Sequence, residues 1–381
     1  MEKYDGIIVG AGIIGCSIAY HLTTKGFKKL LVVDKGGIAS GVTGICPGGV
    51  RQQWGTEINC LMSKRSVSFF ENINEHLQPK EKIGYKSVGY LRTFHSDRAI
   101  EGYQDIMKLQ NSLDIPTRML TPDEVEEIIP GINKDSFLTA SFCGTDGFVD
   151  DANHVTQSFA DAAKREGTTF IDDEVVKILK SSDNKVTGIF TKENGEIASD
   201  FVVNAAGLGS KELAETIDVH LPITFEKRRI LYTKKIEERL LDPLLMSFEK
   251  GFAAKQFANG VLYMSYLGKD LDADSNLQDF QRKTLEVGRE IFPVLDQVEL
   301  RTHIDGIYDS TPDHQAILGD VNGIDGYYQA VGMSGHGFMM SPAIGESIAC
   351  MIAGEKQPMD VSSLHFDRFE TNKLLFEPSV V

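Results

Sequence analysis

Three glycines near the N-terminus have the spacing of a loop that binds phosphate groups. Gly10, Gly12 and Gly15 follow a strand-like run, residues 4–9, and precede a segment with helical spacing, residues 16–24. In such a loop the first glycine allows a tight turn, the second lets backbone approach a pyrophosphate, and the third permits close helix–strand packing. The helix N-terminus adds unpaired N–H groups and a positive dipole end. The pattern predicts a dinucleotide site.

An acidic residue after the next strand indicates which part of the dinucleotide lies there. A second apolar run, residues 30–33, ends in Asp34, nineteen residues after Gly15. A carboxylate at this point accepts hydrogen bonds from a ribose diol and repels a 2′-phosphate. The order of strand, glycine loop, helix and strand is one parallel crossover unit. This unit alone does not separate NAD from FAD.

Two later segments favour FAD. The strand 201–207 ends in the small residues Ala206 and Gly207, which suit a close backbone approach to a large ligand. The glycine-rich segment 330–338 lies before a final helix expected at residues 342–353. A simple NAD dehydrogenase needs no such segment far downstream. FAD does, because its isoalloxazine ring lies far from its adenine and carries a pyrimidine carbonyl that accepts N–H groups.

Composition and charge exclude other classes. The chain has 381 residues, 41% of them hydrophobic, and a formal net charge of −16, which describes a folded protein with room for two domains. The acidic balance disfavours nucleic acid or an anionic membrane as a partner. The sequence contains no run of 18 uncharged apolar residues, so we expect no membrane-spanning helix. The five cysteines are scattered without a CxxC pair, so we expect no metal site, no disulfide framework and a cytoplasmic location.

The motifs GAGIIG, NAAG and GMSGHGF, in this order and spacing, resemble those of the D-amino-acid-oxidase-like family of FAD oxidoreductases. The resemblance covers the whole chain. The stretches GGVRQQWGTEIN, KSVGYLRTF and SGHGFMMSPAIGE look most like sarcosine oxidase-like enzymes and the β subunit of archaeal dye-linked L-proline dehydrogenase. This resemblance implies an α/β fold, with a discontinuous Rossmann-like FAD-binding domain plus an antiparallel-sheet α+β substrate domain.

The resemblance also implies domain boundaries and a set of cofactor residues. We expect the FAD-binding domain over residues 1–82, 145–220 and 320–381, and the substrate domain over residues 83–144 and 221–319. Gly306 stands where monomeric sarcosine oxidases carry a flavin-linked cysteine, so FAD is expected to be bound without a covalent bond. The expected FAD-binding residues are Gly10, Gly12, Ile13, Ile14, Gly15, Asp34, Lys35, Ser40, Val175, Val176, Ala206, Gly207, Gly332, Gly335, His336, Gly337, Phe338 and Met339.

Two candidate substrate residues carry groups that bind a carboxylate. In sarcosine oxidase-like enzymes an arginine matching Arg51 holds the substrate carboxylate, and a planar guanidinium suits that bidentate task. The alternatives for Arg51 are the FAD phosphates and a structural ion pair. Tyr308 lies in a segment that the family turns toward the flavin, where it either donates to a carboxylate or walls the pocket. A core tyrosine with a satisfied hydroxyl is the alternative.

Two further candidates are His336 and Tyr263. The family places a histidine like His336 beside the flavin, where an imidazole that titrates near neutrality can tune the charge of the pocket; a structural loop histidine is the alternative. Tyr263 lies near the position where monomeric sarcosine oxidases carry an oxygen-activating lysine, but the strand 261–266 holds no lysine. Met339 likewise stands where that subgroup has a carboxylate-binding lysine. Both departures favour a dehydrogenase over an oxidase.

The implied reaction is oxidation of the C–N bond of a small, secondary amino acid such as L-proline or sarcosine, by hydride transfer to flavin N5. The electron acceptor is left open between a dye-like or quinone acceptor and a partner subunit. Two alternatives stay beside this interpretation. One is an FAD-dependent 2-hydroxy-acid or glycerol 3-phosphate dehydrogenase, because fold does not fix substrate. The other is an FAD-binding subunit of a heteromeric electron-transfer complex.

Overall fold

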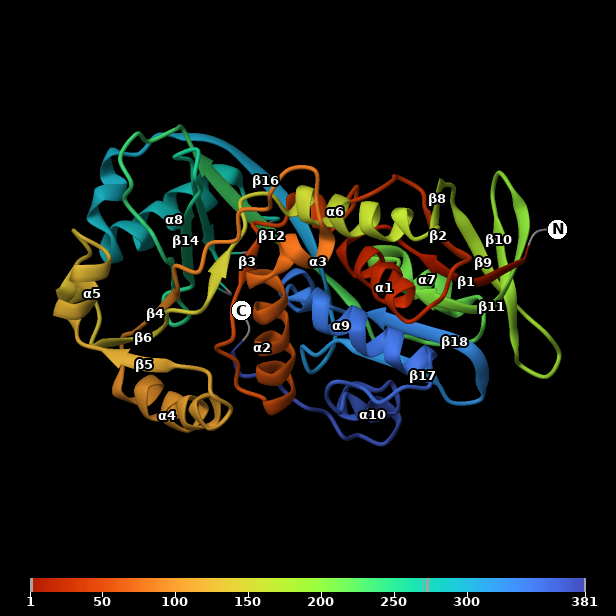
Figure 1. Ribbon diagram of the computed structural model, residues 1–381. Helices are drawn as coiled ribbons and strands as arrows, with labels where there is room; N and C mark the ends of the chain where they lie inside the picture. The colour runs from red at the N-terminus through yellow and green to blue at the C-terminus, as the bar shows by residue number, and fades with distance from the viewer. Residues whose placement is uncertain (1–2, 269, 272–273, 380–381) are drawn as a thin grey trace.

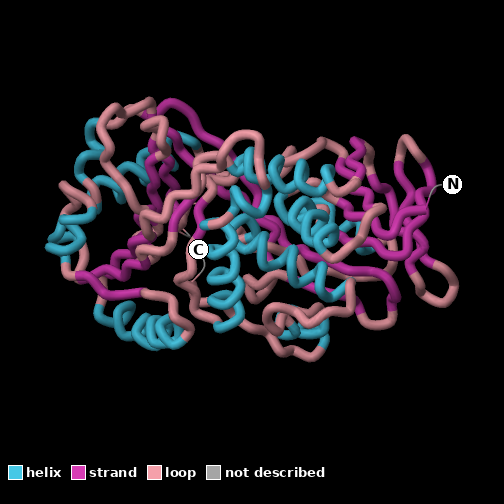
Figure 2. The backbone as a smooth tube through the Cα atoms, viewed as in Figure 1, coloured by secondary structure: helices cyan, strands magenta, loops and turns pink. Residues whose placement is uncertain are grey.

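The computed structural model describes residues 3–268, 270–271 and 274–379, and these form two lobes (Figure 1). Each lobe is built on an eight-stranded sheet, and a separate two-stranded sheet pairs β3 (Gly49–Val50) with β7 (Gly147–Phe148). Figure 2 shows helices packed along the strands of both lobes, so the predicted α/β class is confirmed. Within the described residues, none of the helices has the length and apolarity needed to cross a membrane.

The first sheet has a parallel centre in the order β18, β11, β1, β2, β8. Residues 6–9 of β1 and 30–33 of β2 are buried because both faces of the sheet are covered, as parallel sheets require. Helices α1, α6 and α9 pack on one face and α7 on the other. The bounds are β1 Lys3–Val9, β2 Leu30–Asp34, β8 Thr169–Asp172, β9 Val175–Lys180, β10 Val186–Thr191, β11 Gly195–Asn204, β17 Ile317–Val321, β18 Ile324–Val331, α1 Ile13–Thr24, α6 Ala152–Arg165, α7 Ser210–Glu215 and α9 Gly337–Ile352.

The second sheet has the order β16-β12-β15-β14-β13-β4-β6-β5. Its neighbouring strands are antiparallel except for the parallel pair β13–β4, so the predicted antiparallel substrate sheet is confirmed. Helices α4, α5 and α8 lie along this lobe (Figure 1). The bounds are β4 Tyr90–Phe94, β5 Thr117–Leu120, β6 Thr139–Cys143, β12 Thr224–Thr233, β13 Leu244–Ser247, β14 Phe252–Gln256, β15 Leu262–Tyr266, β16 Leu300–Ser310, α4 Asp97–Ser112, α5 Pro122–Ile128 and α8 Leu277–Ile291.

The last long helix differs from its predicted bounds. We expected it to begin at Pro342, but α9 begins at Gly337 and contains that proline. Proline cannot donate a backbone hydrogen bond to the carbonyl of Phe338, and the hydroxyl of Ser341 donates to that carbonyl instead, at 2.9 Å. The helix can therefore start at the end of the glycine-rich segment, which places that segment at its N-terminus.

The remaining elements lie between or beside the two lobes. α2 (Glu57–Glu71) stands between them in Figure 1, followed by α3 (Ile73–Leu77), and α10 (Asp367–Glu370) lies near the end of the chain. The domain boundaries expected from the sequence stay a prediction. One strand of the first sheet, β17, begins before the expected boundary at residue 320.

Candidate active site

The residues predicted to bind FAD follow the carboxyl ends of neighbouring parallel strands. Because those strands run parallel, their ends meet at one edge of the sheet, which is where ligands of open α/β sheets bind. Gly10–Gly15 follow β1, and Asp34–Ser40 begin at the last residue of β2. Val175–Val176 come after β8, Ala206–Gly207 after β11, and Gly332–Met339 after β18. The fold therefore brings together segments that are hundreds of residues apart in the sequence.

The first glycine loop is packed so tightly that two of its glycines cannot carry a side chain. Gly10 has a φ of +110°, and a Cβ on it would lie 2.2 Å from the carbonyl oxygen of Ala205. A Cβ on Gly15 would lie 1.9 Å from the carbonyl oxygen of Gly10. Gly12 has more room, since the nearest atom to its Cβ would be the hydroxyl oxygen of Thr43 at 3.2 Å. The close strand–helix approach expected from the sequence is present at Gly15.

Asp34 lies where a carboxylate for the ribose was predicted, and it also braces the glycine loop. Its carboxylate oxygens accept hydrogen bonds from the backbone N–H groups of Ala11 and Gly36, both at 2.8 Å, and from the hydroxyl of Ser40 at 3.3 Å. Lys35 and Ser40 are exposed beside it. Val176 is 51% exposed, so it lies on the surface rather than in the sheet core.

The second glycine loop turns sharply between β18 and α9. Gly332, Ser334 and Gly335 have φ values of +68°, +48° and +85°, and for Ser334 this left-handed conformation is unfavourable. The loop is held to the end of β16, because the N–H of Gly332 donates to the Asp309 carboxylate at 3.1 Å. Tyr308 packs so closely that a Cβ on Gly335 would lie 2.3 Å from its ring.

Arg51, Trp54 and His336 lie against one another in a row beside this loop, with the rings of Trp54 and His336 tilted by 57°. The guanidinium carbon of Arg51 lies 3.9 Å from the ring centroid of Trp54, whose centroid lies 4.9 Å from that of His336. His336 is buried, and its Nε2 atom has no hydrogen-bond partner among the described residues. Burial lowers the pKa of His336 to about 3, so the imidazole is neutral at physiological pH. His336 is therefore not expected to change its charge near neutral pH, which the predicted role in tuning the charge of the pocket requires.

Arg51 is a buried cation without a carboxylate partner among the described residues. Its side chain donates to the carbonyl oxygens of Ser379 at 2.5 Å and Gln53 at 3.5 Å, and no carboxylate of the described residues lies within 4.0 Å of it. Burial lowers the pKa of Arg51, but guanidinium keeps its proton in proteins. A buried charge paired only with carbonyls is suited to receive an anion. The structural ion pair, one alternative for this residue, is absent from the described part of the chain.

Neutral tyrosines from the second sheet lie around Arg51. Tyr308 is on β16, Tyr263 on β15 and Tyr90 on β4, and a Cβ on Gly49 would lie 1.9 Å from the hydroxyl oxygen of Tyr90. Burial raises the pKa of each of these tyrosines, so their hydroxyls stay protonated and can donate hydrogen bonds. Of the predicted substrate residues, Arg51, Tyr308 and His336 meet around the second glycine loop, whereas Tyr263 lies further into the sheet.

Two titratable residues that the sequence analysis did not single out support this region. Asp146 is fully buried and accepts hydrogen bonds from the backbone N–H of Gln52 at 2.8 Å and the side-chain amide of Gln53 at 3.1 Å. Burial raises its pKa to about 6. Lys255, on β14, donates to the carbonyl oxygens of Pro47 at 2.5 Å and Val149 at 3.0 Å. No local pattern marks either residue as buried.

The strand 261–266 has no lysine, but Lys255 supplies one beside it. It lies on the neighbouring strand, directly opposite Tyr263. Its ammonium group lies 4.0 Å from the ring centroid of Phe148 and 4.2 Å from that of Phe257. Burial lowers its pKa to about 7. Its hydrogen bonds are all to backbone, so we assign it the task of holding the segment that leads to Arg51.

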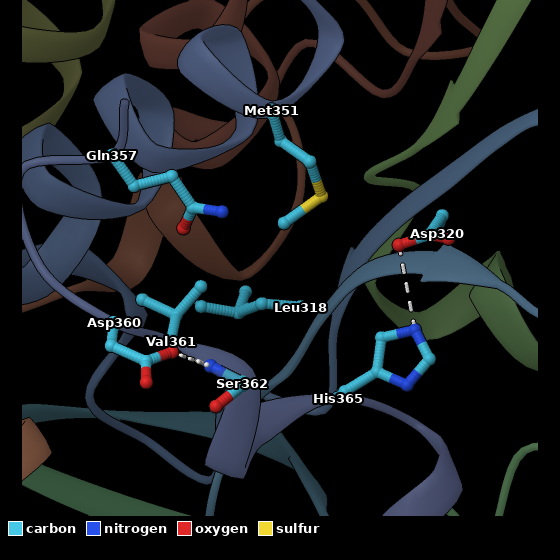
Figure 3. Close-up of a pocket in the computed structure, with 8 residues that line it drawn as sticks. All are labelled: Leu318, Asp320, Met351, Gln357, Asp360, Val361, Ser362 and His365. Carbon is cyan, nitrogen blue, oxygen red and sulfur yellow. Dashed lines mark hydrogen bonds and ion pairs between the residues drawn. The ribbon is translucent and has the colours of Figure 1, made fainter. Parts of the chain in front are cut away.

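A surface cavity elsewhere in the first lobe lies away from this region. It is found at the C-terminal end of α9, and His336 precedes the N-terminal end of that helix, roughly 24 Å away at 1.5 Å per residue. Figure 3 shows His365 turned toward Asp320 on one side of the cavity. The cavity has no arginine or tyrosine, so we do not place the substrate there. Its lining residues are Leu318, Asp320, Met351, Gln357, Asp360, Val361, Ser362 and His365.

A protein-family model described as FAD dependent oxidoreductase matches residues 5–351 of the chain. The chain belongs to this family. Its fold is similar to that of an L-proline dehydrogenase from P. horikoshii, with a TM-score of 0.92, 30% identity, and coverage of 98% of this chain and 100% of that one. The family resemblance and the FAD cofactor predicted from the sequence are thereby confirmed, and the protein is an FAD-dependent enzyme.

Curated relatives extend the similarity to proteins of other lengths. FAD-dependent oxidoreductase domain-containing protein 1 of Xenopus laevis is 26% identical over 431 residues, covering 100% of this chain and 85% of that protein. Mitochondrial dimethylglycine dehydrogenase of Rattus norvegicus is 23% identical over 394 residues, covering 97% of this chain. The chain spans only 45% of the length of that dehydrogenase.

The residues of this oxidoreductase fit its cofactor. Gly10 and Gly15 form a backbone cradle that admits no side chain, at the N-terminus of a helix that favours phosphate. At the other glycine loop, the buried Nε2 of His336 lacks a partner within the described residues, as expected of an atom that faces a bound group. The individual contacts to FAD stay a prediction.

The substitution Gly15→Ala tests the cradle. Its Cβ would overlap the carbonyl oxygen of Gly10, so we expect a loss of about 1–3 kcal/mol in stability and a markedly lower FAD content after purification. Gly102→Ala is the matched control, because Gly102 is also in a helix but has nothing within 4 Å of its Cβ. Flavin absorbance per protein and thermal unfolding measure both effects. Equal flavin content in the two variants would contradict the prediction.

Proposed function

We propose that this enzyme oxidises the C–N bond of a small amino acid, with secondary amino acids such as L-proline and sarcosine as the leading substrates. The observation that carries the proposal is the buried guanidinium of Arg51, which has no carboxylate partner among the described residues and stacks with Trp54 beside His336. A substrate carboxylate would complete this arrangement. The L-proline dehydrogenase named above, whose fold is similar over nearly the whole chain, supports the substrate class.

In this proposal the two glycine loops hold FAD without a covalent bond. Gly306, where a flavin-linked cysteine was considered, faces the side chain of Ile45, since a Cβ there would lie 2.9 Å from it. When bound, the flavin supplies at N5 the acceptor for the hydride that leaves the carbon next to the substrate nitrogen. The protein holds that carbon in place and excludes water.

The side chains around Arg51 bind and orient but do not supply a free base. Arg51 holds the carboxylate, and the protonated hydroxyl of Tyr308 donates a hydrogen bond to it or walls the pocket. Two nearby carboxylates, Asp146 and Glu377, already accept hydrogen bonds, Asp146 from Gln52 and Gln53 and Glu377 from Thr56 and Asn59. We therefore propose that the amine binds in its unprotonated form, so that no proton has to be removed by a side chain.

The methionine at residue 339, in place of a lysine, supports a dehydrogenase, with a dye-like or quinone acceptor or a partner subunit taking the electrons. All five cysteines are free thiols. A cytoplasmic location is part of the proposal because free thiols are typical of a reducing compartment, although the rat relative is named as a mitochondrial protein.

Anaerobic titration of the purified holoenzyme with L-proline tests the proposal. We expect the visible flavin band to bleach with saturation, because reduction of the flavin does not need the unknown acceptor. Sarcosine, L-lactate and glycerol 3-phosphate are added in parallel. Bleaching by L-lactate or glycerol 3-phosphate but by neither amine would overturn the C–N assignment and select the hydroxy-acid or glycerol phosphate alternative. A flavin that no substrate reduces unless a co-purified polypeptide is added would favour an electron-transfer subunit.

A further inference from the structure

A second arginine shares a small cavity with Arg51. The cavity lies between the segment that carries Arg51 and Gln53, the strand β4, and the residues after β13. Arg92 lies on β4, two residues after Tyr90, so the two side chains are on the same face of the strand. The cavity is lined by Arg51, Gln53, Tyr90, Leu91, Arg92, Met246 and Phe248. It thus has two guanidinium groups and aromatic walls.

Arg92 is surrounded by aromatic rings, and none of the described carboxylates pairs with it. Its guanidinium carbon lies 4.1 Å from the ring centroid of Phe248, 4.8 Å from that of Tyr103 and 5.0 Å from that of Phe94. Its Nε atom is buried without a hydrogen-bond partner, and no carboxylate of the described residues lies within 4.0 Å. Burial is the main reason that the pKa of Arg92 falls to about 10, and the charge of Arg51 lowers it further.

The carboxylates in this neighbourhood are already occupied. Asp146 accepts from the amide groups of Gln52 and Gln53, and Glu249 accepts from the backbone N–H of His95 and the hydroxyl of Ser96. The buried carboxylate of Glu377 accepts from Gly55, Thr56, Asn59 and Ser379. None of them is within ion-pair distance of either guanidinium.

Arg51 is buried and Arg92 is half-buried, and neither guanidinium has a carboxylate partner among the described residues. This arrangement costs free energy unless an anion binds between the two cations. Both guanidinium carbons lie close to the same ring of Phe248, at 5.7 Å for Arg51 and 4.1 Å for Arg92, so they are within about 10 Å of each other. The cavity between them holds about 10 Å³, so a four- or five-carbon ligand with a carboxylate at each end can reach both only when side chains that line it, such as Phe248, move aside. A monocarboxylate such as L-proline can satisfy only one.

We propose that the substrate carries a second acidic group, which Arg92 binds while Arg51 binds the first carboxylate. This inference rests on the proposed oxidation of a C–N bond in a secondary amino acid, and it replaces L-proline and sarcosine as leading substrates with dicarboxylic secondary amino acids. Arg92 would then determine specificity, because its charge is unpaired when a monocarboxylate is bound. A guanidinium surrounded by aromatic rings has little conformational freedom to lose when it makes a bidentate contact.

Ligand binding to the oxidised holoenzyme tests this inference without any turnover. Isothermal titration compares glutarate with butyrate, and iminodiacetate, which is achiral, with sarcosine. We expect the dicarboxylates to bind at least tenfold more tightly than their monocarboxylate partners. In Arg92→Gln that preference disappears while the affinity for butyrate changes less than twofold, and Arg92→Lys retains part of it. Arg98→Gln, at an exposed arginine on α4, is the matched control and should keep the preference.

Equal affinity for glutarate and butyrate in the wild-type enzyme would overturn the inference, and so would a preference that survives in Arg92→Gln. If Arg92→Gln fails to fold, the wild-type comparison decides alone. The result is also separable from the proposed function. Dicarboxylate binding through Arg92 with no amine able to bleach the flavin would leave the inference standing and the function wrong. Bleaching by L-proline with no preference for dicarboxylates would support the proposed function and overturn the inference about Arg92.

Discussion

Replacing Arg368 with methionine is expected to lower the free energy of unfolding by about 3–5 kcal/mol, because it leaves the carboxylate of Asp313 buried without its counter-charge. The two side chains are 3% and 0% exposed and form a bidentate pair at 2.8 and 3.1 Å. The same guanidinium donates to the carbonyl oxygens of Leu364 and Gln315. Asp313 also accepts the backbone N–H of Leu375, so the pair anchors the last described segment of the chain.

Two controls make this prediction specific, both measured by denaturant unfolding. Arg118→Met removes an exposed ion pair with Glu124 and should cost less than about 1 kcal/mol. The double variant Arg368→Met with Asp313→Leu removes both charges and should recover part of the lost stability, since an apolar pair does not leave a lone buried ion. A loss below about 1 kcal/mol for Arg368→Met alone would show that the pair does not anchor the segment.

Replacing Arg51 with methionine is expected to raise the substrate concentration that half-saturates flavin bleaching by roughly 30-fold or more. This corresponds to about 2 kcal/mol or more for truncating one partner of a buried, hydrogen-bonded charge pair. Arg51→Lys keeps the charge but loses the planar guanidinium, so its half-saturating substrate concentration should lie between those of the wild-type enzyme and Arg51→Met. The limiting rate at saturation should fall less than the affinity, because the carboxylate is bound in both the ground state and the transition state.

The same variant separates the roles considered for Arg51. If Arg51 bound the FAD phosphates, Arg51→Met would lose flavin during purification. If it only braced the carbonyl of Ser379, the variant would be less stable but would keep its half-saturation unchanged. Arg98→Met, at an exposed arginine on α4, controls for the loss of a positive charge. Rapid-mixing anaerobic reduction and thermal unfolding together distinguish these two roles from binding of the substrate carboxylate.

Local patterns were sufficient to predict the cofactor edge of the first sheet. Positions 10 and 15 require glycine because nearby backbone atoms leave no room for a side chain. The spacing of the two glycines follows from the turn between a strand and a helix. Asp34 lies at the end of the next strand for the same reason. Backbone geometry of this kind repeats wherever the same short segment occurs, so the sequence alone reveals it.

The substrate side could be predicted only in part, because it depends on residues that meet through the tertiary fold. Arg51 was found through the family resemblance, but its carbonyl partner Ser379 lies 328 residues away. Asp146, Lys255 and Arg92 are charged residues in ordinary strand or turn contexts, and nothing local shows that they are buried. Pro342 was misleading, because its missing N–H is compensated by the hydroxyl of Ser341.

The strand order of the first sheet also determines when during synthesis the cofactor edge can form. β1 lies between β2 and β11, β11 pairs with β18, and α1 packs against α9. The first glycine loop is therefore translated early, but the helix that follows it acquires its last packing partner, α9, only after residue 352 has left the ribosome. At roughly 5–20 residues per second the nascent chain waits on the order of 20–70 seconds with this edge incomplete. The apolar strand β1 must be shielded during that interval, which makes chaperone contact with the nascent chain an expected part of its biogenesis.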